Sequence, residues 1–173
     1  MCSRLFAESI VFMNTIAWCN WLTRRTQLLL LMKEPKEIVQ VGALELRFLL
    51  DGDDTDQRLV VFEFSVPPGA RVPAPHYHEA VDEMVYGLAG SMTTTVAGQG
   101  RTLGAGDSCF IPRGVVHHHA NLGTETATLL TVLTPAYIGP AYFRELGALL
   151  QAGGPPDPAR VQEIMAKCGL IVA

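Results

Sequence analysis

The chain has 173 residues, of which 49% are hydrophobic and 17% charged, and its formal net charge is −4. This length suits one hydrophobic core, and because no run of Lys or Arg exceeds the Arg24–Arg25 pair, the sequence predicts no nucleic-acid partner. A small-molecule ligand or substrate is therefore the expected partner. The four cysteines form no CxxC pair and are too sparse for a disulfide-stapled secreted domain, which favours a cytoplasmic protein.

Residues 1–32 differ in character from the rest of the chain. Their two apolar runs, residues 10–22 and 28–32, are both shorter than the roughly 20 residues that span a membrane. The bulky Trp18 also lies near the place where a signal peptide would need small residues. The sequence therefore predicts no membrane partner and no export, but an N-terminal extension that is either poorly ordered or a peripheral helix, with Met32 as an alternative start.

Residues 33–135 break into short segments separated by Gly, Pro and Asp, a spacing that is typical of an all-β sandwich or barrel. Every second residue from Val60 to Val66 is Val or Phe, which predicts a strand with one face in the core. Residues 98–100, Gly-Gln-Gly, predict a hairpin turn. Further strands are predicted at residues 38–50, 83–86, 91–97, 107–111, 116–121 and 127–134.

The pattern changes to helical spacing in the tail formed by residues 136–173. Apolar residues recur every three or four positions in residues 141–151, which predicts a helix. A second helix is predicted to begin after Asp157, which can cap it, and to end near Gly169. We expect both helices to pack on the outside of the barrel or on a partner chain.

All five histidines fall in two short segments of the predicted barrel. His76 and His78 are two residues apart, so on a strand both rings leave the same face and can share one metal ion. Glu83 follows after a short turn and can supply an oxygen ligand. His117 lies on a later strand, which in a closed barrel can complete the ligand shell from the opposite side. The spacing therefore predicts a metal site.

Two longer motifs contain these residues. The first reads Gly69-ARVPAP-His76-Tyr77-His78-EAVD-Glu83-MVYGLA-Gly90, and the second reads Gly106-DSCFI-Pro112-Arg113-Gly114-VV-His117-HHA-Asn121. Over roughly residues 59–134 the chain resembles the cupin superfamily, with one residue more than the family pattern between the first glycine and the first histidine. The resemblance implies a double-stranded β-helix (jelly-roll) barrel with short C-terminal helices. It also implies the ligand set His76, His78, Glu83 and His117.

Imidazole and carboxylate ligands accept several divalent transition metals, so the predicted cofactor is one ion of Fe, Mn, Ni, Cu, Co or Zn. On the predicted strand 116–121, His119 shares the face of His117 and is expected to line the pocket. His118 lies on the opposite face and is expected to point away. The remaining expected pocket residues are mainly apolar and favour a small apolar or aromatic substrate. They are Phe62, Phe64, Val85, Met92, Thr94 and Phe110.

The resemblance and the apolar pocket together favour a metal-dependent oxidoreductase of the quercetin-dioxygenase kind, in which Glu83 also acts as general base. Two alternatives stay open at this point: a binding or sensing module without turnover, and a metal-dependent isomerase or lyase. The resemblance also implies a homodimer, because an unpaired strand near residues 38–50 would otherwise need a cover.

Overall fold

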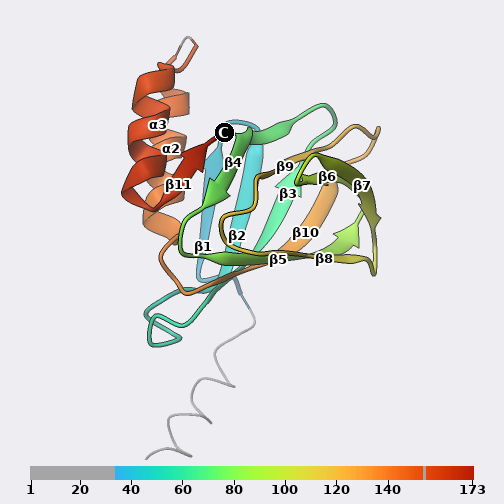
Figure 1. The fold of residues 1–173 in the computed structure, drawn as a ribbon, viewed down its shortest axis with the longest axis horizontal. Coiled ribbons are helices and arrows are strands. Elements are labelled where there is room, and N and C mark those ends of the chain that lie inside the picture. Colours follow the sequence, from blue (N-terminus) through green and yellow to red (C-terminus); the bar gives the residue numbers. More distant parts are fainter. Residues whose placement is uncertain (1–33, 154) are drawn as a thin grey trace, which may run out of the picture. The chain divides into compact units, whose positions relative to one another are not determined.

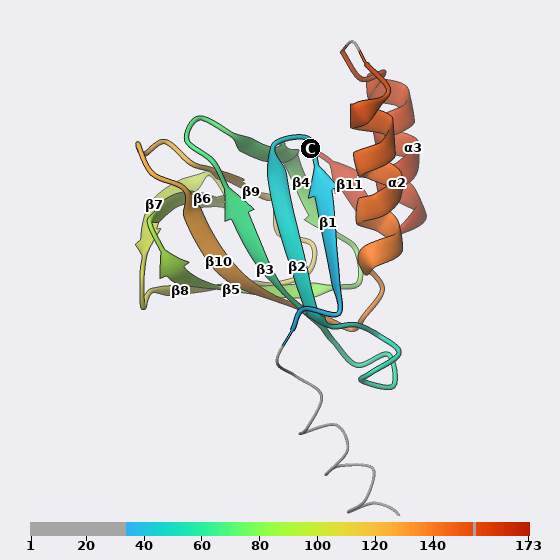
Figure 2. The same ribbon diagram turned by 180° about the vertical axis from the view of Figure 1, so that it is seen from behind.

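The structure, a computed structural model, describes residues 34–153 and 155–173. It consists of two antiparallel β-sheets that face each other, with two helices along one side (Figures 1 and 2). The extension predicted for residues 1–32 lies outside the described residues. Among the described residues, no helix has the length and apolar character needed to cross a membrane.

The first sheet has six strands in the order β1-β2-β3-β10-β5-β8. Their bounds are Glu37–Val41 for β1, Leu44–Leu50 for β2, Val60–Val66 for β3, Ala127–Thr134 for β10, Asp82–Ala89 for β5 and Ser108–Ile111 for β8. The second sheet has five strands in the order β11-β4-β9-β6-β7. Their bounds are Leu170–Val172 for β11, Arg71–His78 for β4, His117–Ala120 for β9, Ser91–Val96 for β6 and Gln99–Gly104 for β7. Because the chain passes repeatedly between the sheets, the fold is the predicted double-stranded β-helix.

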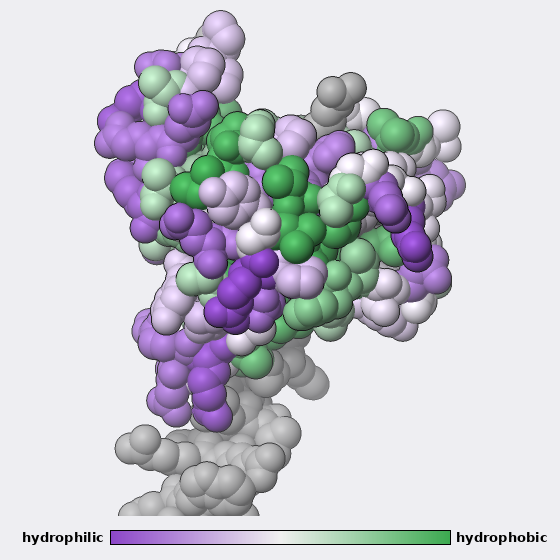
Figure 3. All heavy atoms as spheres, in the orientation of Figure 1, coloured by the Kyte–Doolittle hydropathy of each residue, from purple (hydrophilic) through white to green (hydrophobic). Residues whose placement is uncertain are grey.

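The hydrophobic core lies between the two sheets, as the alternation of β3 predicts. Val60, Phe62, Phe64 and Val66 are buried, and the residues between them are half-buried. In the space-filling view, hydrophilic side chains cover much of the helices at the left, whereas apolar side chains gather over the strands in the middle of the face (Figure 3). On the helix side, α2 (Pro140–Gln151) packs against this core. The ring centroids of its Phe143 and of Phe62 are 5.5 Å apart.

Two local predictions in the strand region are wrong. Residues 38–50 do not form one strand but the hairpin β1–β2, in which Val41 is paired with Leu44. The β6–β7 turn is formed by Ala97 and Gly98 rather than by residues 98–100. Both turn residues have positive φ angles, 49° and 77°, which is what a two-residue type I′ turn requires.

The two predicted helices are present as α2 and α3 (Pro158–Lys167). The side chain of Asp157 accepts a hydrogen bond from the backbone N–H of Ala159, at 3.0 Å, and so caps α3 as expected. Helix α2 lies beside β1 (Figure 2). An ideal Cβ on Gly147 would be 2.3 Å from the carbonyl oxygen of Gln40, so the glycine allows this close approach.

The tail is not wholly helical, because Leu170–Val172 forms the strand β11. This strand pairs antiparallel with β4, and Leu170 and Val172 are the register partners of His78 and His76. Three residues are too few to show a strand periodicity, so the sequence pattern gave no sign of β11. The tail therefore supplies part of the sheet that carries two predicted ligands.

Candidate metal centre

The structure brings the four predicted metal ligands together between the two sheets. His76 and His78 lie on β4, Glu83 lies on β5 and His117 lies on β9. All four side chains are buried. Because β4 and β9 are neighbours in one sheet and β5 belongs to the facing sheet, the carboxylate approaches the imidazoles from the opposite side of the barrel.

The extra residue in the first motif coincides with a β-bulge in β4. The register of β4 against β9 shifts between Val72 and His76, where four steps on β4 correspond to only two steps on β9. After the shift His76 is paired directly with His117. The bulge thus places two more residues on β4 than on β9, and His76 and His78 stay on one face after it.

The spacing of the ligand atoms suits one ion. Nε2 of His76 and Nε2 of His78 are 3.2 Å apart. Oε2 of Glu83 is 3.3 Å from Nε2 of His117 and 3.9 Å from Nε2 of His78. Two atoms bound to the same ion at about 2.1 Å each can be at most about 4.2 Å apart. All three distances fall within this limit.

Hydrogen bonds at Nδ1 orient two of the imidazoles so that their Nε2 atoms face the site. Nδ1 of His76 is 3.1 Å from the carbonyl oxygen of Ala74, and Nδ1 of His117 is 2.9 Å from that of Val115. Because a carbonyl oxygen can only accept, each Nδ1 carries the hydrogen and each Nε2 is left unprotonated in the neutral ring. Hydrogen bonds of this kind orient metal-binding histidines.

A buried atom without a partner supports the same conclusion. Among the described residues, Nε2 of His117 is a buried side-chain atom that has no hydrogen-bond partner, although Oε2 of Glu83 is 3.3 Å away. A buried polar atom without a hydrogen bond is uncommon, because it loses its hydrogen bonds to water and gains none in the protein. A divalent ion would satisfy it, so the donor set fits a metal ion.

Glu83 directs its two oxygens to different neighbours. Oε2 faces the imidazoles, whereas Oε1 is 3.2 Å from Nε2 of His119. Nδ1 of His119 is in turn 2.9 Å from the hydroxyl of Thr94. Since a carboxylate only accepts, His119 donates through Nε2 and accepts from Thr94. Both ring nitrogens of His119 are thus engaged, and its ring positions Glu83.

His119 also belongs to a second group of possible ligands, formed with Glu83 and His117, while His76, His78 and His117 form the first group. The hydrogen bonds of His119 favour the first group together with Glu83. His118 is half-buried and lies on the other face of β9, as expected.

Comparison with known proteins assigns the segment that carries these residues to a family. Residues 62–133 match the family described as the cupin domain, and this segment contains all four predicted ligands. The chain carries a cupin-superfamily domain. Within it, 94 residues that make up 54% of this chain are 35% identical to quercetin 2,3-dioxygenase from Bacillus subtilis. The aligned part is 27% of that enzyme, so the chain spans about a quarter of its length.

Solved structures show the same fold. A predicted oxalate decarboxylase from Thermotoga maritima has a TM-score of 0.52 and 26% identity, over 59% of this chain and 92% of that chain. An RmlC-like cupin from Shewanella frigidimarina has a TM-score of 0.50 and 25% identity, over 58% of this chain and 84% of that chain. Both proteins are similar to this cupin through the barrel.

The electrostatics of the cupin site keep two imidazoles neutral. Burial, together with the neighbouring histidines, lowers the pKa of His76 to about 3, and burial lowers the pKa of His78 to about 4. Burial raises the pKa of Glu83, but the hydrogen bond from His119 and the charge of His117 and His119 more than offset this and hold it well below its ordinary value. The carboxylate is therefore ionised, and His76 and His78 stay neutral. Burial lowers the pKa of His117, but the adjacent Glu83 more than offsets this, so the pKa of His117 is raised.

The cavity at the ligands has a volume of only about 60 Å³, the space of about two water molecules. Of the predicted pocket residues, Phe62, Phe64 and His119 line it. Val85 and Met92 are buried in the barrel core but are not part of this lining.

The prediction for Phe110 is wrong, because its side chain is 60% exposed. On β8 the inward face is set by pairing with β5: Ile111 is opposite Glu83, and Phe110 is opposite Met84 on the outer face. Because neighbouring residues of a strand point to opposite faces, the prediction selected the wrong face of β8.

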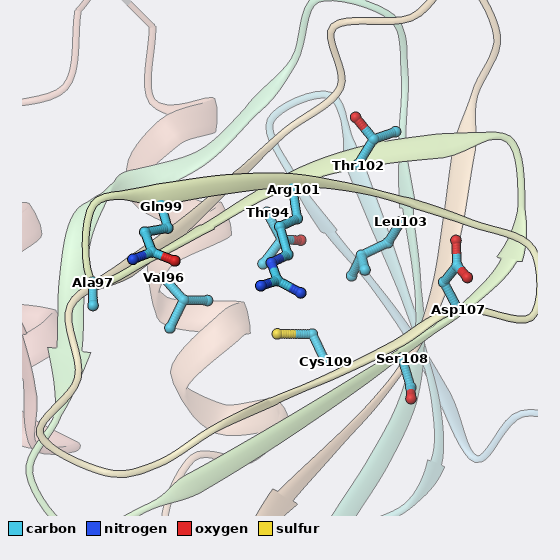
Figure 4. Close-up of a pocket in the computed structure, with 10 residues that line it drawn as sticks. All are labelled: Thr94, Val96, Ala97, Gln99, Arg101, Thr102, Leu103, Asp107, Ser108 and Cys109. Carbon is cyan, nitrogen blue, oxygen red and sulfur yellow. The ribbon is translucent and has the colours of Figure 1, made fainter.

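Thr94 lines a larger cavity of about 550 Å³ between β6, β7 and β8. Figure 4 shows Arg101 and Cys109 reaching into this cavity from β7 and β8. Burial and the charge of Glu83 raise the pKa of the Cys109 thiol. The larger cavity shares no lining residue with the cavity at the ligands, since Thr94 and His119 stand between them.

Sequence reasoning missed part of the wall at the metal ligands. Ile138, Tyr142 and Phe143 line this cavity from the loop before α2 and from α2 itself, and Leu170 lines it from β11. The apolar spacing of residues 141–151 predicted a helix with one buried face, but it did not show which wall of the barrel that face would cover.

Proposed function

We propose that this cupin is a metal-dependent oxidoreductase of the dioxygenase type, which acts on a small apolar or aromatic substrate. His76, His78, Glu83 and His117 hold one divalent transition metal ion in this proposal. The observation that carries it is the convergence of buried imidazole nitrogens and one carboxylate oxygen, with Nε2 of His117 lacking any other partner among the described residues. The similarity to quercetin 2,3-dioxygenase supports the reaction type.

The protein residues have distinct roles in this proposal. A bound divalent ion supplies Lewis acidity and, if it is redox-active, chemistry with O2. Glu83 serves as general base, because an ionised buried carboxylate accepts a proton from an acidic C–H or O–H of the substrate. His119 holds Oε1 of Glu83 in place, at 3.2 Å. The apolar wall formed with Phe62 and Phe143 limits water around the reacting atoms.

A second reaction class has its own support. The similarity to a predicted oxalate decarboxylase favours a redox-neutral lyase, in which the ion acts only as a Lewis acid. Oxygen consumption separates the two. A dioxygenase transfers both atoms of one O2 molecule into its product and needs no further reductant, whereas a lyase turns over at the same rate without O2.

The first experiment measures metal content. Untagged wild-type protein, His117→Ala and His118→Ala are purified in parallel and analysed for bound metals. We expect about one ion per chain in the wild type and in His118→Ala, whose ring lies on the other strand face, and a loss of the ion in His117→Ala. Equal metal content in both variants would contradict the site, and absence of metal in all three after reconstitution would contradict the metal-dependent function.

The role of Glu83 is tested by Glu83→Gln, with the exposed Glu79→Gln as control. Libraries of small phenols, enols and ketones are screened for turnover, with O2 uptake as the readout. We expect Glu83→Gln to reduce turnover on the order of 100-fold or more, while Glu79→Gln stays active. Full activity and full metal content in Glu83→Gln would exclude the proposed base. Tight binding without turnover of any compound would favour a binding module.

We also infer that the protein forms a homodimer. Helix α2 covers part of β1, so the predicted strand edge is not the strongest candidate surface. The outer faces of β5 and β8 expose Tyr86, Leu88 and Phe110, at 38%, 41% and 60%. Contiguous exposed apolar side chains of this kind are typical of protein contacts.

A further inference from the structure

We propose that the apolar cavity between β1, β2 and the two helices binds the tail of the substrate, while the substrate's polar head reaches the metal ligands. This inference rests on the proposed metal-dependent function and specifies its substrate class. The cavity has a volume of about 230 Å³ and no charged side chain in its lining. Its outer end is formed by Val41 and Leu44 from the β1–β2 hairpin and by Leu150 and Val161 from α2 and α3.

The cavity is adjacent to the space at the metal ligands. Four residues line both: Leu46, Phe64, Tyr142 and Phe143. The larger cavity at Arg101 has no residue in common with the ligand cavity. These four side chains form the wall that a molecule in the apolar cavity must displace to reach the ligands. They are held by apolar packing alone, whereas the wall toward the larger cavity contains the hydrogen-bonded pair of Thr94 and His119.

The chemistry of the walls defines the ligand. Burying a charged group among these aliphatic and aromatic side chains without a partner is strongly unfavourable. The volume of about 230 Å³ is somewhat smaller than the roughly 300 Å³ at which pockets for drug-sized ligands begin. We infer a molecule with one aromatic ring or a short alkyl chain, ending in a single oxygen-bearing group that can bind a metal ion.

The apolar cavity, which we call the tail pocket, is lined mainly by residues outside the segment that matches the cupin family. The match covers residues 62–133, whereas Tyr142, Leu150 and Val161 belong to α2 and α3. The barrel thus supplies the ligand set, and the helices supply the pocket that selects the tail.

Two hydroxamates test this inference, because they share a metal-binding head and differ in tail length. Acetohydroxamate and hexanohydroxamate are titrated by calorimetry into protein loaded with Zn²⁺ or Ni²⁺. Each CH2 group that becomes buried should increase the affinity about fourfold. We expect hexanohydroxamate to bind at least 30-fold more tightly than acetohydroxamate.

The variant Val161→Phe fills the outer end of the cavity and touches no predicted ligand. We expect it to reduce the affinity for hexanohydroxamate at least tenfold, and to leave metal content and acetohydroxamate binding unchanged. Val61→Phe adds the same volume to the outer face of β3 and serves as control. Leu150→Trp replaces Val161→Phe if the latter does not fold. Equal affinity for both hydroxamates, or an unchanged preference in the filled variant, would overturn the inference.

A metal-free measurement keeps the tail pocket testable if the metal proposal fails. 1-Hexanol is added to the apoprotein, and methyl chemical shifts are followed by NMR. We expect shifts at Val161 and Leu150 but not at Val61. Shifts at these positions without metal binding would retain the pocket and reject the metal function, and the absence of shifts would reject the pocket itself.

Discussion

Leu170 is the register partner of His78 in the antiparallel pair of β11 and β4. Its side chain is 4% exposed and lines the cavity at the predicted ligands. The strand that carries His76 and His78 is thus held from one side by β9 and from the other by β11. A residue far from both sequence motifs therefore supports the geometry of the site.

Leu170→Ala should destabilise the protein by about 3 kcal/mol, because truncating a buried Leu leaves a cavity. Urea unfolding followed by circular dichroism measures the change. Leu122→Ala is the matched control, since Leu122 is 70% exposed and should lose less than about 0.5 kcal/mol. Similar losses in the two variants would mean that β11 contributes little to the sheet.

The hydroxyl of Thr94 supports the site through His119. Thr94→Val keeps the shape of the side chain but removes the hydrogen bond to Nδ1 of His119, so His119 holds Glu83 less firmly. We expect metal affinity to fall by about 10- to 100-fold, as is usual for groups that orient metal ligands. Competition with a chelator of known affinity gives this value. Thr93→Val, on the other face of β6, should leave it unchanged.

The parts of the site that could be predicted from the sequence depend on local periodicity. His76 and His78 share a face because strands have a period of two, and the same rule separates His118 from His117 and His119. These relations hold within one strand, so they stay valid even if the pairing of the other strands is predicted wrongly. The motifs then supplied the long-range pairing that periodicity alone does not specify.

The parts that could not be predicted depend on register and on packing between distant elements. Phe110 is exposed because β8 is paired with β5 in one register, which four residues cannot reveal. Tyr142 and Phe143 line the cavity at the ligands because α2 packs beside the barrel, a tertiary contact without local signal. β11 is too short to show a pattern.

The metal-free protein should lose stability as the pH falls below the ordinary histidine value of 6.5. Burial lowers the pKa of His76 to about 3 and that of His78 to about 4. Between these values and 6.5 the unfolded chain binds more protons than the folded one, so protonation favours unfolding. We expect a loss on the order of 2 kcal/mol between pH 6.5 and pH 5.

Urea unfolding in the presence of EDTA at several pH values checks this prediction. The variant His76→Gln/His78→Gln removes both shifted groups and should show a much flatter pH dependence over the same range. The half-buried His118→Gln is the control and should retain the wild-type dependence. A variant lacking both rings that loses stability as steeply as the wild type would place the effect elsewhere in the protein.

The proposed homodimer makes Phe110 a sensitive position. Met84 and Phe110 are register partners on the outer faces of β5 and β8, next to the exposed Tyr86. Phe110→Glu places a charge where a second copy would bury an aromatic ring, and burying an unpaired charge is strongly unfavourable. We therefore expect a dimer for the wild type at micromolar concentration and a monomer for Phe110→Glu, measured by light scattering. Leu122→Glu, which changes an even more exposed residue outside this surface, should remain dimeric. If Leu122→Glu dissociates and Phe110→Glu does not, the dimer contact lies on another face. A monomeric wild type would contradict the proposed dimer.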